Sequence, residues 1–334
     1  MPAAPSAVTL VFSEPVTPAG FGIHVYSPSG QQVAGQVVQH GSVLSAPESG
    51  ATQPGTYVVL WQVYAADTHP SRGAFAFSVV SSSANPYSGL LDQAAAGTST
   101  PLGVALQALA RWVHFLGFAL VFGLVAYRFG SFPRLVNTGL VLLVAAEPIS
   151  LLAQLASLSF DSDTALAVIG SPFGRVLGLR LGAALLGWTV LATGRRWAVL
   201  ADGAAIAVLD GLTAHAIPGV PVLGQLLVAV HVGAMGLWVG GLVGFIREPD
   251  RRFPRYAIAT FATAAATGLV LGLVHTEWAT QLLTTDYGRA LFVKIAIVAA
   301  AAVAAYLARR RAELAIAAAA IGAASLVAAL PPPF

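Results

Sequence analysis

A histidine and a methionine four residues apart, His231 and Met235, lie in an apolar stretch long enough to cross a lipid bilayer. Four residues make about one helical turn, so both side chains share one helix face, and Trp238 follows on it. Imidazole and thioether are ligands for a soft transition metal such as copper. The spacing predicts a metal contact at this pair. The alternative is a hydrogen bond from the imidazole to a neighbouring helix.

Three further histidines occur in or at the ends of apolar segments, namely His114, His215 and His275. The loop charges described below place all three in the same half of the membrane as His231. This placement favours a ladder of metal ligands that leads toward His231 and Met235. The alternative for each histidine is a hydrogen bond to a carbonyl or hydroxyl group of a neighbouring helix.

Two acidic residues, Glu147 and Asp210, fall inside apolar segments, and Pro148 follows the first of them. Carboxyl groups at membrane depth are costly and are functional candidates by default. We therefore predict that Glu147 and Asp210 are proton or cation stations. The alternative is a carboxylic acid that keeps its proton and a hydrogen bond. Pro148 should kink its helix and free a carbonyl group.

The composition is that of a membrane protein: 57% of the 334 residues are hydrophobic and 9% are charged, against about 25% charged in soluble proteins. There is no cysteine, which excludes disulfides and thiolate metal sites. The single lysine, Lys294, is not part of a phosphate-binding loop, so a P-loop ATPase is excluded. We expect no enzymatic activity and no nucleic-acid partner.

Eight apolar segments approach the ~20 residues that span hydrocarbon. They are predicted near 104–127, 135–159, 174–194, 197–217, 222–246, 255–276, 287–308 and 312–331. Arginines concentrate in alternate loops, after the first, third, fifth and seventh segments, and acidic residues occupy the others. Since basic loops face the cytoplasm, the region before the first segment and the C-terminus are both predicted to lie outside the plasma (inner) membrane.

Residues 1–80 have a different pattern. Short runs rich in β-forming residues, at 8–12, 22–26, 56–64 and 73–80, are separated by Gly, Pro and Ser turns. This pattern predicts a small immunoglobulin-like β-sandwich. A polar linker at 81–103 follows, and then a transmembrane domain at 104–334. No signal peptide is predicted in this sequence, because the first residues lack a basic start and an apolar core.

Several of these stretches resemble known copper proteins. Residues 8–16, 54–61, 66–70 and 73–79 resemble the periplasmic copper-binding family CopC. Three features resemble the CopD family. They are His231 with residues 238–241, residues 285–289 with Lys294, and the prolines at 331–333. A chain with both in this order resembles the CopC–CopD fusions of the YcnJ-like copper importers.

The resemblance implies a cupredoxin-like β-domain with one Cu(II) site and an all-α membrane domain of eight helices tied to copper uptake. CopC sites use an amino-terminal histidine and an Asp-x-His pair. Asp67 and His69 match the pair, whereas no residue matches the amino-terminal histidine. His24 and His40 are the candidate substitutes. The intramembrane ligands would carry Cu(I) or Cu(II).

The predicted function is copper binding and transport across the plasma membrane, in the direction of import. Copper would pass from the outer β-domain to the intramembrane His and Met ligands. The expected partners are copper ions, the lipid bilayer and a periplasmic copper chaperone. Two alternatives stay open. One is a haem-binding electron-transfer protein with paired histidines as axial ligands. The other is a copper receptor or store that does not transport.

Overall fold

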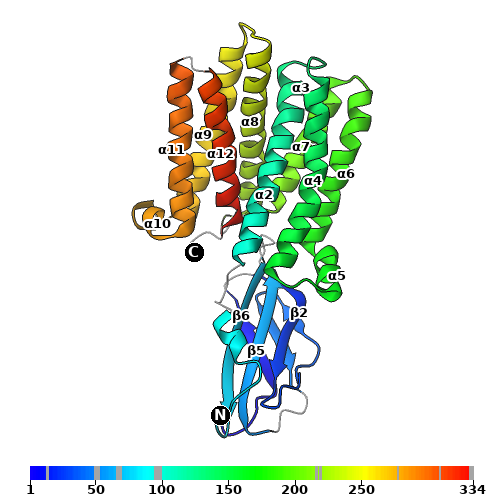
Figure 1. Ribbon diagram of the computed structural model, residues 1–334, viewed down its shortest axis with the longest axis vertical. Helices are drawn as coiled ribbons and strands as arrows, with labels where there is room; N and C mark the ends of the chain where they lie inside the picture. Colours follow the sequence, from blue (N-terminus) through cyan, green and yellow to red (C-terminus); the bar gives the residue numbers. More distant parts are fainter. Residues whose placement is uncertain are drawn as a thin grey trace. The chain divides into compact units, whose positions relative to one another are not determined.

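The structure is a computed structural model that describes residues 1–12, 15–48, 53–64, 70–93, 100–214, 217, 220–276, 278–307 and 310–330 (Figure 1). The chain forms two compact units. The β-unit comprises Met1–Gly103 and Gln154–Gly174, and the helical unit comprises Val104–Ala153 and Arg175–Phe334. Each unit is described by itself.

Two three-stranded antiparallel sheets form the β-unit. One sheet has the order β1-β4-β3, with β1 at Ala7–Val11, β4 at Val43–Pro47 and β3 at Val38–His40. The other has the order β2-β5-β6, with β2 at Thr17–Tyr26, β5 at Gly55–Tyr64 and β6 at Pro70–Val79. Four of these strands lie where the sequence predicts them. The missed strands β3 and β4 are short, and every residue of β3 is exposed.

The two sheets share one apolar core, so the predicted β-sandwich is confirmed. Leu44 and Ala46 of the first sheet pack in one cluster with Val25, Tyr57 and Val59 of the second. Within the second sheet, Val25 pairs with Val59. Alternating side chains of β1, β2, β4, β5 and β6 reach this core, as the period of two residues in a strand requires, whereas β3 contributes none.

Helix α5 (Ser162–Gly170) is also part of the β-unit and begins at a capped residue. The Asp161 carboxylate accepts a hydrogen bond from the Thr164 backbone N–H at 2.8 Å. Strand β2 approaches this helix at Gly20, whose φ of +53° favours glycine. A Cβ added there would lie 2.9 Å from Gln62 Oε1 and 3.2 Å from Thr164 Oγ1. Glycine at this position therefore permits the contact between strand and helix.

Seven helices in the described part of the chain are long and apolar enough to cross a membrane. They are Pro101–Tyr127 (which joins α2, Pro101–Phe118, the π-helix η1, Ala119–Gly123, and α3, Leu124–Tyr127), α4 (Pro133–Ser157), α6 (Pro172–Ala192), α8 (Pro221–Arg247), α9 (Phe253–His275), α11 (Asp286–Tyr306) and α12 (Arg310–Ala329). Helices α11 and α12 run side by side (Figure 1).

The fourth predicted segment, 197–217, forms helix α7 (Arg196–Leu212) of 17 residues. This length is at the lower limit of the roughly 17–25 residues of a membrane-crossing helix. All eight predicted segments therefore form helices, and α7 is the shortest of them. Thr213 ends the helix, and its backbone N–H bonds to the carbonyl groups of Asp210 and Gly211. The remaining helices are short and lie where the sequence predicts connections, α1 at Gly89–Gln93 and α10 at Trp278–Thr284.

Helix α8 packs against η1 with the two backbones in contact. A Cβ added to Gly240 would lie 2.6 Å from the Cα of Gly123, closer than real Cβ atoms come. The glycines therefore allow a helix contact that larger side chains would prevent, as is common in membranes. Helix α8 also contributes to two apolar clusters of the helical unit, through Trp238 and Leu242 to one and Val243 to the other.

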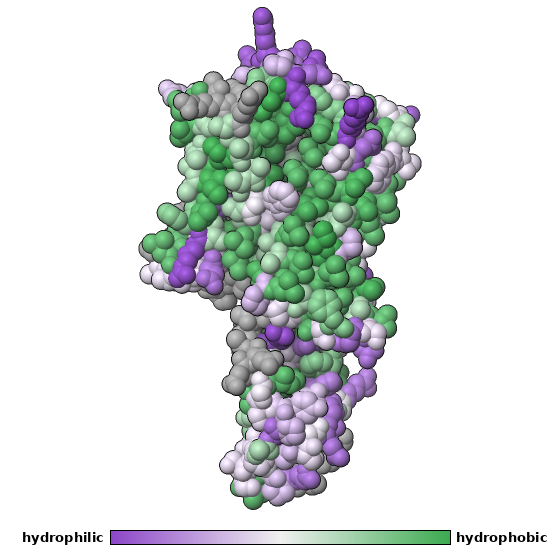
Figure 2. Space-filling view, in the orientation of Figure 1, coloured by the Kyte–Doolittle hydropathy of each residue, from purple (hydrophilic) through white to green (hydrophobic). Residues whose placement is uncertain are grey.

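Three of the arginine-bearing loops lie at one end of the helical unit. Arg128 donates to Glu248 at 2.7 Å, and Arg196 donates to the carbonyl oxygen of Ala126. These contacts join the connections that follow α3, α6 and α8. Figure 2 shows hydrophilic side chains gathered at this end and hydrophobic side chains over much of the visible helix surface. Three of the loops that the sequence predicts to be basic therefore lie at the same end of the helix bundle.

Candidate functional site

Four charged or polar side chains meet in the interior of the helical unit, and each comes from a different helix. We call this group the charged quartet: His114 of α2, Glu147 of α4, Arg180 of α6 and Asp210 of α7. Each residue is at most 9% exposed. Buried charges in a membrane protein are expected to pair with one another, and this group does so.

Arg180 is the centre of the quartet. Its Nη2 and Nε donate to Glu147 Oε2 at 2.9 and 3.3 Å, and its Nη1 donates to Asp210 Oδ1 at 3.1 Å. His114 joins both carboxylates from the other side, with Nε2 at 3.0 Å from Asp210 Oδ2 and Nδ1 at 3.6 Å from Glu147 Oε1. Two carboxylates, one guanidinium and one imidazolium together have no net charge, so a protonated His114 completes the group.

The structure thus brings together three residues that the sequence predicts separately. Glu147 and Asp210, predicted as proton or cation stations, share one arginine. His114, predicted as a metal ligand, faces carboxylates with both ring nitrogens and would have to leave them to bind a metal. Helix α4 continues through Pro148.

Sequence reasoning missed Arg180 and two further buried acids, Asp202 of α7 and Glu313 of α12. Asp202 is 8% exposed, and its Oδ2 has no hydrogen-bond partner in the described part of the chain. The signal for Arg180 was present, because an arginine inside an apolar segment requires an acidic partner in another segment.

A second polar centre surrounds His231. Its Nδ1 lies 2.9 Å from the carbonyl oxygen of Ala264 and 3.1 Å from Thr267 Oγ1 on α9. A carbonyl oxygen only accepts, so Nδ1 carries the proton and Nε2 presents its lone pair. That Nε2 lies 3.4 Å from Lys294 Nζ on α11. Gly268 makes room for the ring, since a Cβ there would lie 2.8 Å from His231 Cε1.

Met235 lies one turn beyond His231, and the two residues line two cavities. A cavity of about 120 Å³ is bounded by His231, Met235, His275, Lys294 and, from the charged quartet, Asp210. A cavity of about 480 Å³ is bounded by His231, Met235 and Lys294 together with mainly apolar side chains. The predicted pair of ligands therefore faces open space.

The other histidines of the predicted ladder are placed as follows. His275 ends α9, is 3% exposed, lines the smaller cavity and bonds through Nδ1 to the carbonyl oxygen of Leu271 at 2.8 Å. His215 lies outside the described residues, as do Asp67 and His69 of the β-unit. Their roles stay predictions.

The described residues contain no group of three or more His, Cys, Asp or Glu side chains that could hold a metal ion. A metal at His231 would therefore rely on the Met235 thioether as a neighbouring ligand. Thioether ligands favour Cu(I). Within its described lining, the larger cavity offers one histidine, His231, and so a single axial ligand for a haem.

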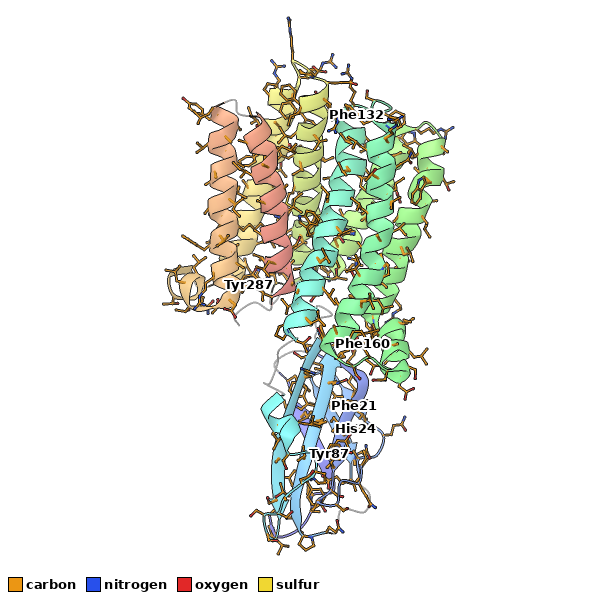
Figure 3. All side chains as sticks on the ribbon, viewed as in Figure 1. Phe21, His24, Tyr87, Phe132, Phe160 and Tyr287 are labelled. Carbon is orange, nitrogen blue, oxygen red and sulfur yellow. The ribbon has the colours of Figure 1, made fainter. Side chains whose placement is uncertain are left out.

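His24 and His40, the candidate substitutes in the β-domain, lie on different sheets. The His24 ring stacks on Phe21 at 4.0 Å, and its Nδ1 lies 3.2 Å from the Tyr26 hydroxyl group (Figure 3). Tyr26 stacks in turn on Tyr87 at 3.9 Å. Burial lowers the pKa of His24, which favours the neutral ring. His40 is exposed at the end of β3.

Comparison with known proteins gives two family matches. Residues 1–80 match the CopC domain, and residues 250–330 match Copper resistance protein D. The proteins named Protein YobA of Escherichia coli K12 and of Shigella flexneri are each 36% identical to this chain over 81 residues. That alignment covers 23% of this chain and 65% of each relative, just under two thirds of their length. No solved structure matches the chain.

Proposed function

One chain joins a CopC domain to a copper resistance protein D domain in a multi-pass membrane protein, and we propose that it carries copper across the plasma membrane. The observation that supports transport best is the smaller cavity. There a histidine whose Nε2 lone pair faces Lys294 and a methionine thioether line the same cavity as the carboxylate of Asp210. Nitrogen and sulfur ligands suit Cu(I), and a nearby carboxylate favours a cation.

The proposed direction is import. The arginine-bearing loops at one end of the helical unit face the cytoplasm by the positive-inside rule. Residues 1–80 then form an extracytoplasmic domain, 81–103 a linker, and 104–334 the transmembrane domain with its C-terminus outside. A cation moving inward gains about 2.3 kcal/mol per charge per 100 mV of membrane potential. This force suffices without a nucleotide site.

In this proposal the β-domain receives Cu(II), at Asp67 and His69, from a periplasmic copper chaperone. A one-electron reductant outside this chain supplies the electron where the ion passes on as Cu(I). His114, His215 and His275 are the further stations of the route, and His231 with Met235 forms its deep station. Glu147 and Asp210 are the proton or cation stations. Because both are neutralised by Arg180 and His114 in the structure, the arrival of a cation beside Asp210 would compete with these pairs.

The test is copper uptake by proteoliposomes that contain the full chain. His231→Ala should abolish uptake, and Met235→Leu should reduce it, because each removes one proposed ligand. Val230→Ala is the matched control, since Val230 neighbours His231 on α8 but is exposed. Unchanged uptake in the His231 variant would refute the proposal.

The same preparation tests the alternatives. Copper that binds but never appears inside the vesicles would favour a receptor or store. A Soret band in the purified protein would favour the haem-binding alternative. The single histidine in the described lining of the larger cavity argues against paired axial ligands at that place.

A further inference from the structure

Lys294 places an ammonium group against the atom that copper would need. The residue is partly buried, and it lines both cavities. Its Nζ has one polar partner among the described residues, His231 Nε2 at 3.4 Å. An ammonium group inside a membrane protein is normally paired with a carboxylate. This one faces a neutral imidazole instead.

The imidazole of His231 cannot bind the ammonium group of Lys294 and a copper ion at the same time. Its Nδ1 is held by the Ala264 carbonyl group, so Nε2 has the only lone pair that the ring presents to a ligand. That lone pair accepts the hydrogen bond of Lys294 in the structure. A copper ion can bind His231 only when the ammonium group leaves Nε2.

We propose that Lys294 is an internal competitor for copper at His231. The inference rests on the proposed function of His231 as a copper ligand. Copper exchanges with the ammonium group at one nitrogen instead of adding to an empty site. The displaced ammonium group remains in one of the two cavities that it lines, close to the bound ion. Copper is therefore held weakly and released readily, which suits transfer and does not suit storage.

The size of the effect follows from the repulsion between two unit charges. At about 4 Å this repulsion corresponds to roughly a 5-fold change in affinity in a water-like environment and to roughly a 1,000-fold change at an effective dielectric constant of about 20. Lys294→Leu removes the charge and adds no copper ligand. We therefore expect this variant to bind Cu(I) at least about fivefold more tightly than the wild type.

The experiment is a Cu(I) titration of the purified full chain in detergent, in competition with a chromophoric Cu(I) chelator. Lys294→Arg is the matched control, because it keeps the charge and should retain weak binding. Lys294→Gln should resemble the Leu variant and provides the same test if that variant does not fold. In proteoliposomes the tighter-binding variants should hold copper and turn over more slowly.

The His231→Ala variant distinguishes failure of the competitor role from failure of the proposed function. If this variant lowers Cu(I) affinity while Lys294→Leu and Lys294→Gln stay within twofold of the wild type, the competitor role is refuted and the copper site stands. If His231→Ala changes neither affinity nor uptake, the proposed function itself fails. Tighter binding by Lys294→Leu that is lost again in the double variant with His231→Ala would support both.

Discussion

Arg180 is the residue on which the charged quartet depends, and its removal gives a quantitative test. Arg180→Met deletes three hydrogen bonds, two to Glu147 and one to Asp210. Hydrogen bonds to charged groups contribute about 1.5–3 kcal/mol each, which sets an upper limit of roughly 5–9 kcal/mol. Part of this is offset, because the arginine no longer has to be buried. Removing one partner of a buried ion pair typically costs about 3–5 kcal/mol, and we expect a loss of that size.

The cost should depend on the charges left behind. In Arg180→Met, two carboxylates face only His114. In the double variant with Glu147→Gln, the remaining imidazolium and Asp210 carboxylate neutralise each other. We therefore expect the double variant to recover most of the lost free energy of unfolding, even though it has lost a second native side chain.

Equilibrium unfolding of the full chain in mixed micelles, followed by tryptophan fluorescence, measures these differences. Arg175→Met, at an exposed position of α6, is the control and should change stability by no more than about 0.5 kcal/mol. A loss below about 1 kcal/mol for Arg180→Met would place the contacts among ordinary interhelical hydrogen bonds. That result, or a double variant no more stable than the single one, would refute the reasoning.

Two further predictions concern His231 and His24. Gly268→Ala should displace the His231 ring and destabilise the protein by about 1–3 kcal/mol. The same variant should weaken Cu(I) binding about tenfold in chelator competition. Gly233→Ala is the control and should have none of these effects, because there is open space around Gly233. Burial lowers the pKa of His24 in the folded chain. As the pH falls, His24 of the unfolded chain is therefore protonated before His24 of the folded chain. The contribution of His24 to stability is thus complete above about pH 6.5 and is lost as the pH falls through the lower folded value. Below pH 6.5 the hydrogen-exchange rate of β2 in the full chain, divided by the intrinsic rate, should rise, and His24→Phe should remove that rise. An unchanged rise would assign it to another group.

The architecture could be predicted from the sequence because it follows from local composition. Apolar length marks the membrane helices, and arginine alternation marks one end of the bundle, as the contact of Arg128 with Glu248 bears out. The predicted resemblance to CopC and CopD is confirmed by the family matches. The fourth segment was predicted too long, since apolar residues continue past the point where Thr213 ends the helix.

The polar centres could be predicted only in part. Glu147 and Asp210 stood out because charge is rare in apolar segments. Their common partner Arg180 depends on how three helices are rotated about their axes, which no single segment reveals. The same holds for Lys294, whose chemical importance comes from its distance to His231 on another helix. Sequence pattern indicates which groups are unusual, and the tertiary contacts decide which of them meet.

The π-helix η1 determines which changes in chain length this helix accepts. A π turn holds one residue more than an α turn, so it resets the direction in which the following residues point. Before it, His114 reaches the carboxylates of the charged quartet; at its end, Gly123 contacts α8. Deleting one residue of η1 would allow a regular α-helix whose two halves keep about their present directions, because the deletion removes the extra residue that the π turn accommodates. Both partnerships could then persist, so η1 is the place in this helix where the fold should accept a one-residue deletion. The same deletion in a regular α-helix would turn one half by about 100° against the other.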